Sequence, residues 1–199
     1  SNTPQSSYLD LPDNLPVPQD DGGADHLDGG SGNDSLSGGN GNNTLVGGSG
    51  ADTMVGGTGN DSIVVDDLND SVSGAAGTDS VLANIDGYIL GDASAVEWLI
   101  AGTGVTTLSG NSISNTILGG AGNDYLSGGN GNDSIFGGSG ADTLVGDSGN
   151  DTLVVDHLND SVDGGSGTDS LIANINGYIL GNSSSVEWLI TGTGVTTLT

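Results

Sequence analysis

The chain of 199 residues contains no lysine, no arginine and no cysteine. None of its 26 acidic side chains can therefore pair with a basic side chain, and the formal net charge is −26. A charge of this size opposes a compact state unless bound cations neutralise it. It also argues against a nucleic-acid partner, because phosphate recognition needs positive charge. The lack of cysteine excludes disulfides and thiolate metal sites.

Long apolar runs are absent as well. No stretch of about 18 apolar residues exists, so we predict no membrane span, and the first residues do not read as a basic-then-apolar signal peptide. The two histidines, His26 and His157, are solitary, and no serine or threonine has a histidine at matched spacing. We therefore predict that the chain is not an enzyme.

Glycine is abundant, with 39 residues. Residues 119–145 read GGAGNDYLS, GGNGNDSIF and GGSGADTLV, three units of the form Gly-Gly-x-Gly-x-Asp-x-U-x in which U is large and apolar. The glycines allow a tight turn, and the last three residues alternate with the period of a strand. Each unit is predicted to be a six-residue acidic turn and a three-residue strand. Carboxylate and carbonyl oxygens without histidine or cysteine favour calcium over zinc or copper.

The nine-residue phase extends far beyond these three units. Every ninth residue from Leu27 is apolar, although apolar residues make up only 33% of the chain. This pattern predicts one continuous all-β stack with the column buried along its axis. The column consists of Leu27, Leu36, Leu45, Met54, Ile63, Val72, Val81, Leu90, Leu99, Leu108, Ile117, Leu126, Ile135, Leu144, Leu153, Val162, Leu171, Leu180, Leu189 and Leu198.

A longer period of 90 residues is superimposed on the short one. Residues 56–108 differ from residues 146–198 at only 15 of 53 positions. We predict a first module at 20–109 and a second at 110–199, forming one continuous solenoid. Residues 1–19 contain all four prolines and read as a linker, or as a cap over the end of the stack.

The glycine motif disappears in residues 83–109 and 173–199. Tyr88 and Glu97 stand where other units carry the motif aspartate, and the same holds in the second module. These coils are either metal-free spacers or, if Trp98 and Trp188 stay exposed, a contact surface. Each tryptophan precedes a column residue, so strand alternation predicts that it points outward.

The glycine-rich units resemble those of the RTX, or haemolysin-type, calcium-binding nonapeptide-repeat proteins. The resemblance implies a parallel β-roll, a β-solenoid in which each nonapeptide makes half a turn, with about twenty half-turns here. It also implies calcium ions between turns that are two nonapeptides apart, held by turn carbonyls and by aspartates of both turns. Counting one ion per plausible pair gives roughly six to ten ions. Proteins of this family are typically secreted through a type I channel, so we expect an extracellular or cell-surface location.

Carried over residue by residue, the resemblance assigns metal ligands in most turns. The best-matched pairs are Asp34 with Asp52, Asp124 with Asp142, Asp133 with Asp151, Asp151 with Asp169, and Asp61 with Asp79. Weaker positions are Asn43 and Asn115, which are neutral, and Asp70 and Asp160, whose turns lack glycine. Asp25 completes the carboxylates. The accompanying motif glycines are Gly29, Gly30, Gly32, Gly47, Gly48, Gly50, Gly56, Gly57, Gly59, Gly119, Gly120, Gly122, Gly128, Gly129, Gly131, Gly137, Gly138, Gly140, Gly146 and Gly149.

Three functional hypotheses remain open at this point. The first is a structural or adhesive module that folds on calcium binding outside the cell, as part of a larger secreted or surface protein. The second is a non-catalytic accessory module of a secreted protease, lipase or epimerase. The third is a flat β surface that binds glycan or ice. The expected partners are calcium ions and flanking domains, with possible glycan or surface contacts.

Overall fold

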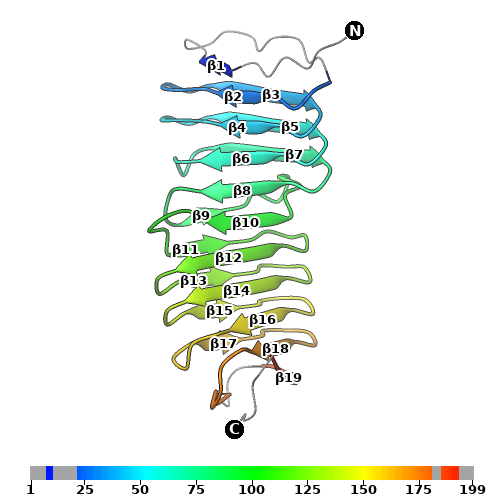
Figure 1. The fold of residues 1–199 in the computed structure, drawn as a ribbon. Coiled ribbons are helices and arrows are strands. Elements are labelled where there is room, and N and C mark those ends of the chain that lie inside the picture. The colour runs from blue at the N-terminus through cyan, green and yellow to red at the C-terminus, as the bar shows by residue number, and fades with distance from the viewer. Residues whose placement is uncertain (1–7, 11–21, 181–184, 193–199) are drawn as a thin grey trace. The chain divides into compact units, whose positions relative to one another are not determined.

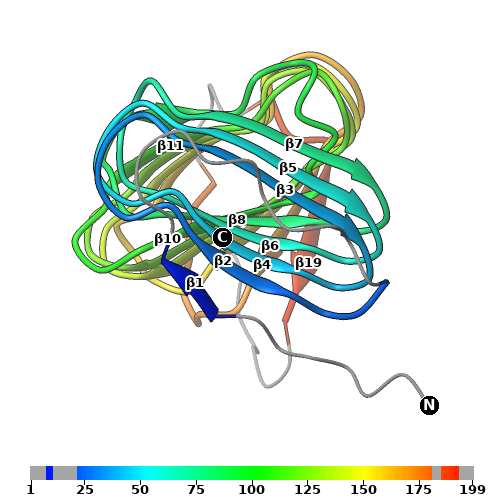
Figure 2. The ribbon, with the colours of Figure 1, turned by 90° about the horizontal axis from the view of Figure 1, so that it is seen from above.

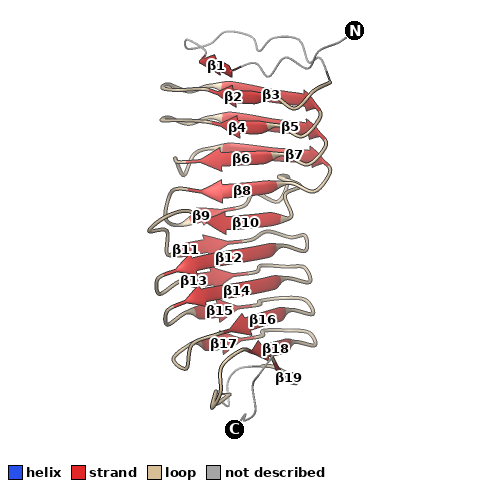
Figure 3. Ribbon diagram, viewed as in Figure 1, coloured by secondary structure: helices blue, strands red, loops and turns tan. Residues whose placement is uncertain are grey.

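The computed structural model describes residues 8–10, 22–180 and 185–192. Within these ranges the chain is built of strands and turns and contains no helix (Figure 3), and accordingly no helix that could cross a membrane. The chain divides into two compact units. Unit 1 comprises Ser1–Ile85 and Leu90–Trp98, and unit 2 comprises Asp86–Ile89 and Leu99–Thr199.

Unit 1 consists of two parallel sheets that face each other (Figures 1 and 2). Odd and even nonapeptides alternate between them, so successive strands from β2 to β8 belong to opposite sheets. The first sheet contains β1 (Tyr8–Asp10), β2 (His26–Asp28), β4 (Thr44–Val46), β6 (Ser62–Val65) and β8 (Ser80–Ala83). The second contains β3 (Ser35–Asn40), β5 (Thr53–Thr58) and β7 (Ser71–Ala76).

Unit 2 repeats this arrangement. One set of parallel strands is β12 (Thr116–Ala121), β14 (Ser134–Ser139), β16 (Thr152–Val155), β18 (Ser170–Ala173) and β19 (Trp188–Thr191). The other is β9 (Tyr88–Ile89), β11 (Thr107–Ser109), β13 (Tyr125–Ser127), β15 (Thr143–Val145) and β17 (Ser161–Asp163). Strand β10 (Trp98–Ala101) begins with the last residue of unit 1 and continues into unit 2.

Strand register establishes the solenoid. Leu45 pairs with Ile63 in unit 1, and Ile135 pairs with Leu153 in unit 2, so one full turn takes two nonapeptides. Each nonapeptide is therefore half a turn, as the β-roll prediction requires. The strands of the described residues account for about nine turns, so the number of half-turns differs from the predicted twenty. Neither Leu90 nor Leu180 lies in a strand, and Leu198 is outside the described residues.

The prediction of an uninterrupted nine-residue phase was wrong at one place. Strand β9 pairs with β11 so that Tyr88, rather than Leu90, lies opposite Leu108. The partner of Leu108 is thus the residue two positions before the one that the repeat predicts. Both Tyr88 and Leu90 are buried, so the large phenol ring occupies core space that the acidic turns leave to a smaller carboxylate. Apolar periodicity alone cannot reveal this shift, because both residues are apolar enough for the core.

The apolar column forms the core of each unit. Sixteen of its members are buried, including Leu45, Ile63, Leu126 and Leu144, which have no exposed surface. Val72 and Leu180 are half-buried, and Leu189 is 36% exposed. Strand β19 pairs only with β18 among the described residues, which leaves the other side of Leu189 uncovered. The outward direction predicted for Trp98 is confirmed, since it is 39% exposed beside the buried Leu99; Trp188 is 61% exposed in a strand whose four residues are all exposed.

Candidate metal centres

The turn aspartates form carboxylate ladders, series in which each aspartate contacts the aspartate one full turn earlier. In every step the Oδ1 of the later residue accepts a hydrogen bond from the backbone N–H of the earlier one. The bond is 2.8 Å from Asp34 to Asp52, 2.7 Å from Asp61 to Asp79, 2.9 Å from Asp124 to Asp142, and 2.8 Å both from Asp133 to Asp151 and from Asp151 to Asp169. All five predicted pairs are therefore adjacent. The earlier residue's N–H is satisfied, and the later residue's second oxygen is left for another partner.

That second oxygen, Oδ2, points into its own turn. It is buried and has no hydrogen-bond donor among the described residues in a set of eight turns: Asp52, Asp61, Asp79, Asp124, Asp133, Asp142, Asp151 and Asp169. An ionised oxygen buried without a partner is costly. The chain supplies no lysine or arginine to compensate it. These oxygens are therefore placed for a cation.

The first glycine of these turns leaves a space beside that oxygen. A methyl group on Gly119 would lie 2.7 Å from Asp124 Oδ2 and 2.6 Å from the carbonyl oxygen of Gly137, in the next turn on the same edge. Two hard oxygens thus converge on a space that any side chain at Gly119 would fill. The same construction recurs at Gly29, Gly128 and Gly146. A side chain at any of these glycines would collide with the neighbouring oxygens.

The second and fourth glycines are required for backbone conformation. Gly120 and Gly122 have φ angles of +94° and +136°, in the region that L side chains rarely adopt. Positive φ is found at all such predicted positions: Gly30, Gly32, Gly48, Gly50, Gly57, Gly59, Gly120, Gly122, Gly129, Gly131, Gly138, Gly140 and Gly149. Asp147, which replaces a motif glycine, keeps a φ of +69°, a conformation that aspartate tolerates better than most residues.

The electrostatics of the turns follow from burial and like charge. Burial, opposed in part by the N–H of Asn115 and reinforced by the charges of Asp151 and Asp147, raises the pKa of Asp133 to about 7. Burial also raises the pKa of Asp151 to about 6. The hydrogen bond from the N–H of Asp133 lowers this pKa in part, and the negative charges of Asp169 and Asp147 raise it further. A bound divalent cation would reverse this effect by favouring the ionised carboxylates.

The positions predicted to be weaker differ in visible ways. Asn43 directs its amide Nδ2, a donor, towards the carbonyl of Gly41, although its Oδ1 still accepts from Asp25. The amide oxygen of Asn115 accepts from the N–H of Asn111 in its own turn. Asp160 uses one oxygen for Asp142 and the other for two N–H groups of its own turn. Neutral amides therefore occupy positions 43 and 115, whereas Asp160 is a carboxylate whose orientation its donors fix.

Sequence reasoning missed three kinds of residue. Glu97 and Glu187 continue the ladders in the coils without glycine motif, because their Oε2 atoms accept from the N–H of Asp79 at 2.8 Å and of Asp169 at 2.6 Å. Asp86 accepts from the N–H of Thr106, so Asp124 Oδ1 also has no donor within the described ranges. The glutamates lie in the same nine-residue phase as the aspartates, a signal that could have identified them.

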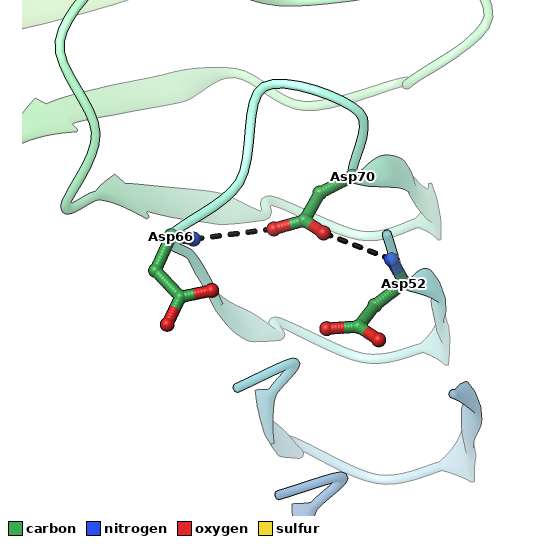
Figure 4. A group of neighbouring side chains, drawn as sticks. All are labelled: Asp52, Asp66 and Asp70. Atoms are coloured by element: carbon green, nitrogen blue, oxygen red, sulfur yellow. Dashed lines mark hydrogen bonds between the residues drawn. The ribbon is translucent and has the colours of Figure 1, made fainter. Parts of the chain in front are cut away.

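Asp66 and Asp156 are the third kind. Each belongs to a glycine-free turn and was assigned no role by the repeat pattern. Asp66 approaches Asp52 and Asp70 so that one carboxylate oxygen of each lies within 4.8 Å of the others (Figure 4). Asp156 forms the equivalent group with Asp142 and Asp160.

Comparison with known families supports the geometric assignment. The family described as RTX calcium-binding nonapeptide repeat (4 copies) matches overlapping segments that together cover more than half of the chain: 20–54, 46–81, 100–135, 109–144, 118–153 and 145–175. The chain belongs to the RTX calcium-binding nonapeptide repeat family. A search of curated proteins found no match.

The residues present fit the cation that defines the RTX repeats. Calcium takes six to eight oxygen ligands at about 2.3–2.6 Å, from carboxylates and backbone carbonyls alike. The turns of this RTX chain offer both kinds, and the buried Oδ2 atoms lack any other partner among the described residues. Which turns bind, and how many ions are bound in total, stay predictions from the repeat pattern.

Proposed function

We propose that this RTX chain is a calcium-dependent structural module that folds outside the cell, as a spacer or adhesive segment of a larger secreted or surface protein. The observation that supports it is the row of buried Oδ2 atoms that have no hydrogen-bond donor in the described part of the chain, which contains no basic side chain to pair with them. Ionised together without cations, these carboxylates oppose the stack; with calcium between the turns they join successive turns to each other.

Coupling of binding to folding follows from how the sites are assembled. Each contains oxygens from two successive turns on the same edge, and such a site does not exist in the unfolded chain. One site stabilises the fold by about 1.4 kcal/mol when the free calcium concentration is ten times its dissociation constant. Extracellular modules bind calcium with dissociation constants of about 0.1–1 mM. A chain that depends on several such sites would be unfolded at cytosolic calcium concentrations and folded at extracellular ones.

A structural role fits the remaining side chains better than catalysis does. His157, for example, accepts a hydrogen bond from the N–H of Asn159 through Nδ1 and so stabilises its own turn. Tyr178 donates to the carbonyl of Asp160, which anchors the ring in the core. Neither residue is arranged to activate a nucleophile. The accessory-module hypothesis differs only in the parent protein and is decided by the sequence that flanks this chain.

Circular dichroism tests the proposal directly. Metal-stripped protein at neutral pH is expected to show the spectrum of an unfolded chain, and millimolar calcium is expected to restore the β spectrum. Magnesium at the same concentration is the matched control, since it demands a smaller octahedral shell and keeps several of its waters. A β spectrum that is the same in calcium and in chelator at neutral pH would refute calcium-dependent folding.

A further inference from the structure

The glycine-free turns 65–70 and 155–160 differ chemically from the other turns. Val65, Asp66 and Leu68 stand where the other turns carry the three motif glycines, so the turn cannot present its backbone in the same way. Instead, the N–H groups of Asp66 and Asp67 donate to Asp70 Oδ2 at 3.1 and 3.2 Å. Asp70 Oδ1 accepts from Asp52 at 2.9 Å. These three donors fix the orientation of the Asp70 carboxylate.

The fixed carboxylate faces two others. Figure 4 shows Asp66 and Asp52 on either side of a common point below Asp70, with their carboxylates directed towards it. Asp52 is 1% exposed, and its Oδ2 has no hydrogen-bond donor among the described residues. Asp66 is exposed and closes the group from the solvent side. Oxygens that bind one calcium ion lie about 3–5 Å from one another. The three carboxylate oxygens of this group, one from each aspartate, lie within 4.8 Å of one another and so match that spacing.

The second module repeats the group with the same elements. Asp142 is 1% exposed, and its Oδ2 has no donor in the part of the chain that the structure describes. Asp160 is held by the N–H groups of Asp156 and His157, and Asp156 is exposed. The two modules differ at the next position, where Asp67 is replaced by His157. Both side chains accept the N–H of the residue two positions later, at 2.8 Å to Asp67 Oδ1 and 3.3 Å to His157 Nδ1. That position therefore stabilises the turn, while the cation group comprises the other three aspartates.

We propose that Asp52, Asp66 and Asp70, and equally Asp142, Asp156 and Asp160, each form a tri-carboxylate calcium site, in which Asp66 or Asp156 adds a third carboxylate to the pair from two successive turns. Its ligands are side chains of three aspartates from two turns, with water on the exposed side of Asp66 or Asp156. The charge of the ligands sets calcium affinity, so these are the two tightest sites of the chain and fill first. The proposal rests on the calcium binding proposed above.

The test compares two neighbouring substitutions that remove the same charge. Asp66→Asn removes a carboxylate from the group, whereas Asp67→Asn removes one beside it and keeps an amide oxygen to accept from Asn69. Calcium binding to metal-stripped protein is measured by calorimetry. We expect the parent to show two ions in its tightest phase, Asp66→Asn to show one with at least about tenfold weaker binding of the other, and Asp67→Asn to show two.

The double variant Asp66→Asn/Asp156→Asn should lose the tightest phase entirely while reaching the parent β spectrum at saturating calcium. Asp66→Asn with the same stoichiometry and affinities as the parent would refute the tri-carboxylate site and leave calcium-dependent folding intact. A parent chain that binds no calcium would refute both. Equal losses in Asp66→Asn and Asp67→Asn would show that only the net charge matters, and would refute the site as well.

Discussion

Acid should stabilise the calcium-free coil, and the buried aspartates set the size of the effect. The pKa values of Asp133 and Asp151 rise from an ordinary 3.8 to about 7 and about 6 on folding. At pH 5 both are mostly protonated in the fold and mostly ionised in the unfolded chain. The folded state therefore binds roughly two protons more than the unfolded state at this pH, counting these two groups alone.

The sign of the effect follows from that difference. A state that binds more protons loses stability as pH rises, so the contribution is full below pH 3.8 and disappears as pH passes through 6 and 7. Above that range the ionised turns need calcium. We expect metal-stripped protein to gain β structure at pH 5 relative to pH 8, a range that lies above the isoelectric point of about 4.1. With calcium present the trend reverses, because binding requires ionised carboxylates.

Urea titrations of metal-stripped protein, followed by circular dichroism from pH 5 up to the pH at which the calcium-free chain is already unfolded, measure the proton difference as the slope of unfolding free energy against pH. Asp133→Asn should reduce that slope by about one proton. Asp67→Asn is the control, because the hydrogen bonds from Asn69 lower the pKa of Asp67 instead of raising it. The reasoning fails if the calcium-free chain is equally unfolded at pH 5 and pH 8, or if Asp133→Asn leaves the slope unchanged.

Two further predictions concern space in the turns and in the core. A methyl on Gly137 would overlap Asp142 Oδ2, so Gly137→Ala should lose one calcium ion and about 1.4 kcal/mol at ten times the dissociation constant. A methyl group on Gly91 would meet no atom within 4 Å, so Gly91→Ala should bind calcium as the parent does. Calorimetry distinguishes the two variants. Leu144 is fully buried, so Leu144→Ala should lower the unfolding free energy in calcium by about 2–5 kcal/mol. Leu158→Ala, at a side chain that is 55% exposed, should change it by less than about 0.5 kcal/mol, and a similar loss in both would contradict the assigned core.

The fold could be predicted from sequence because one period controls everything that a turn needs. Glycines at fixed places allow positive φ, an aspartate follows, and a single apolar residue enters the core. The predicted pairing of every second nonapeptide and the adjacency of aspartates such as Asp124 and Asp142 follow from that period. Where local rules agree in this way, the stack has few alternatives.

The period could not predict what happens where the motif is absent. Tyr88 shifts the pairing of β9 by two residues, because a phenol ring fills more of the core than the residue it replaces. Asp66 reaches its group through the path of a turn without glycine, and no repeat position defines that path. Glu97 was in phase but lacked the motif around it, so its place in the ladder became evident only from its contact with Asp79.

The two modules together show that oxygen placement, rather than charge alone, is what the turns maintain. Ala95 and Ser185 occupy equivalent positions, and both adopt positive φ, at +47° and +44°, although neither is glycine. Their carbonyl oxygens lie against Gly74 and Gly164 respectively, beside the Oδ2 of the aspartate in that turn. A non-glycine residue in this conformation costs about 1–3 kcal/mol and persists only where the surroundings impose it. Because the strain recurs while the side chain changes, the requirement is for the carbonyl, which completes the last glycine turn before the interrupted coil.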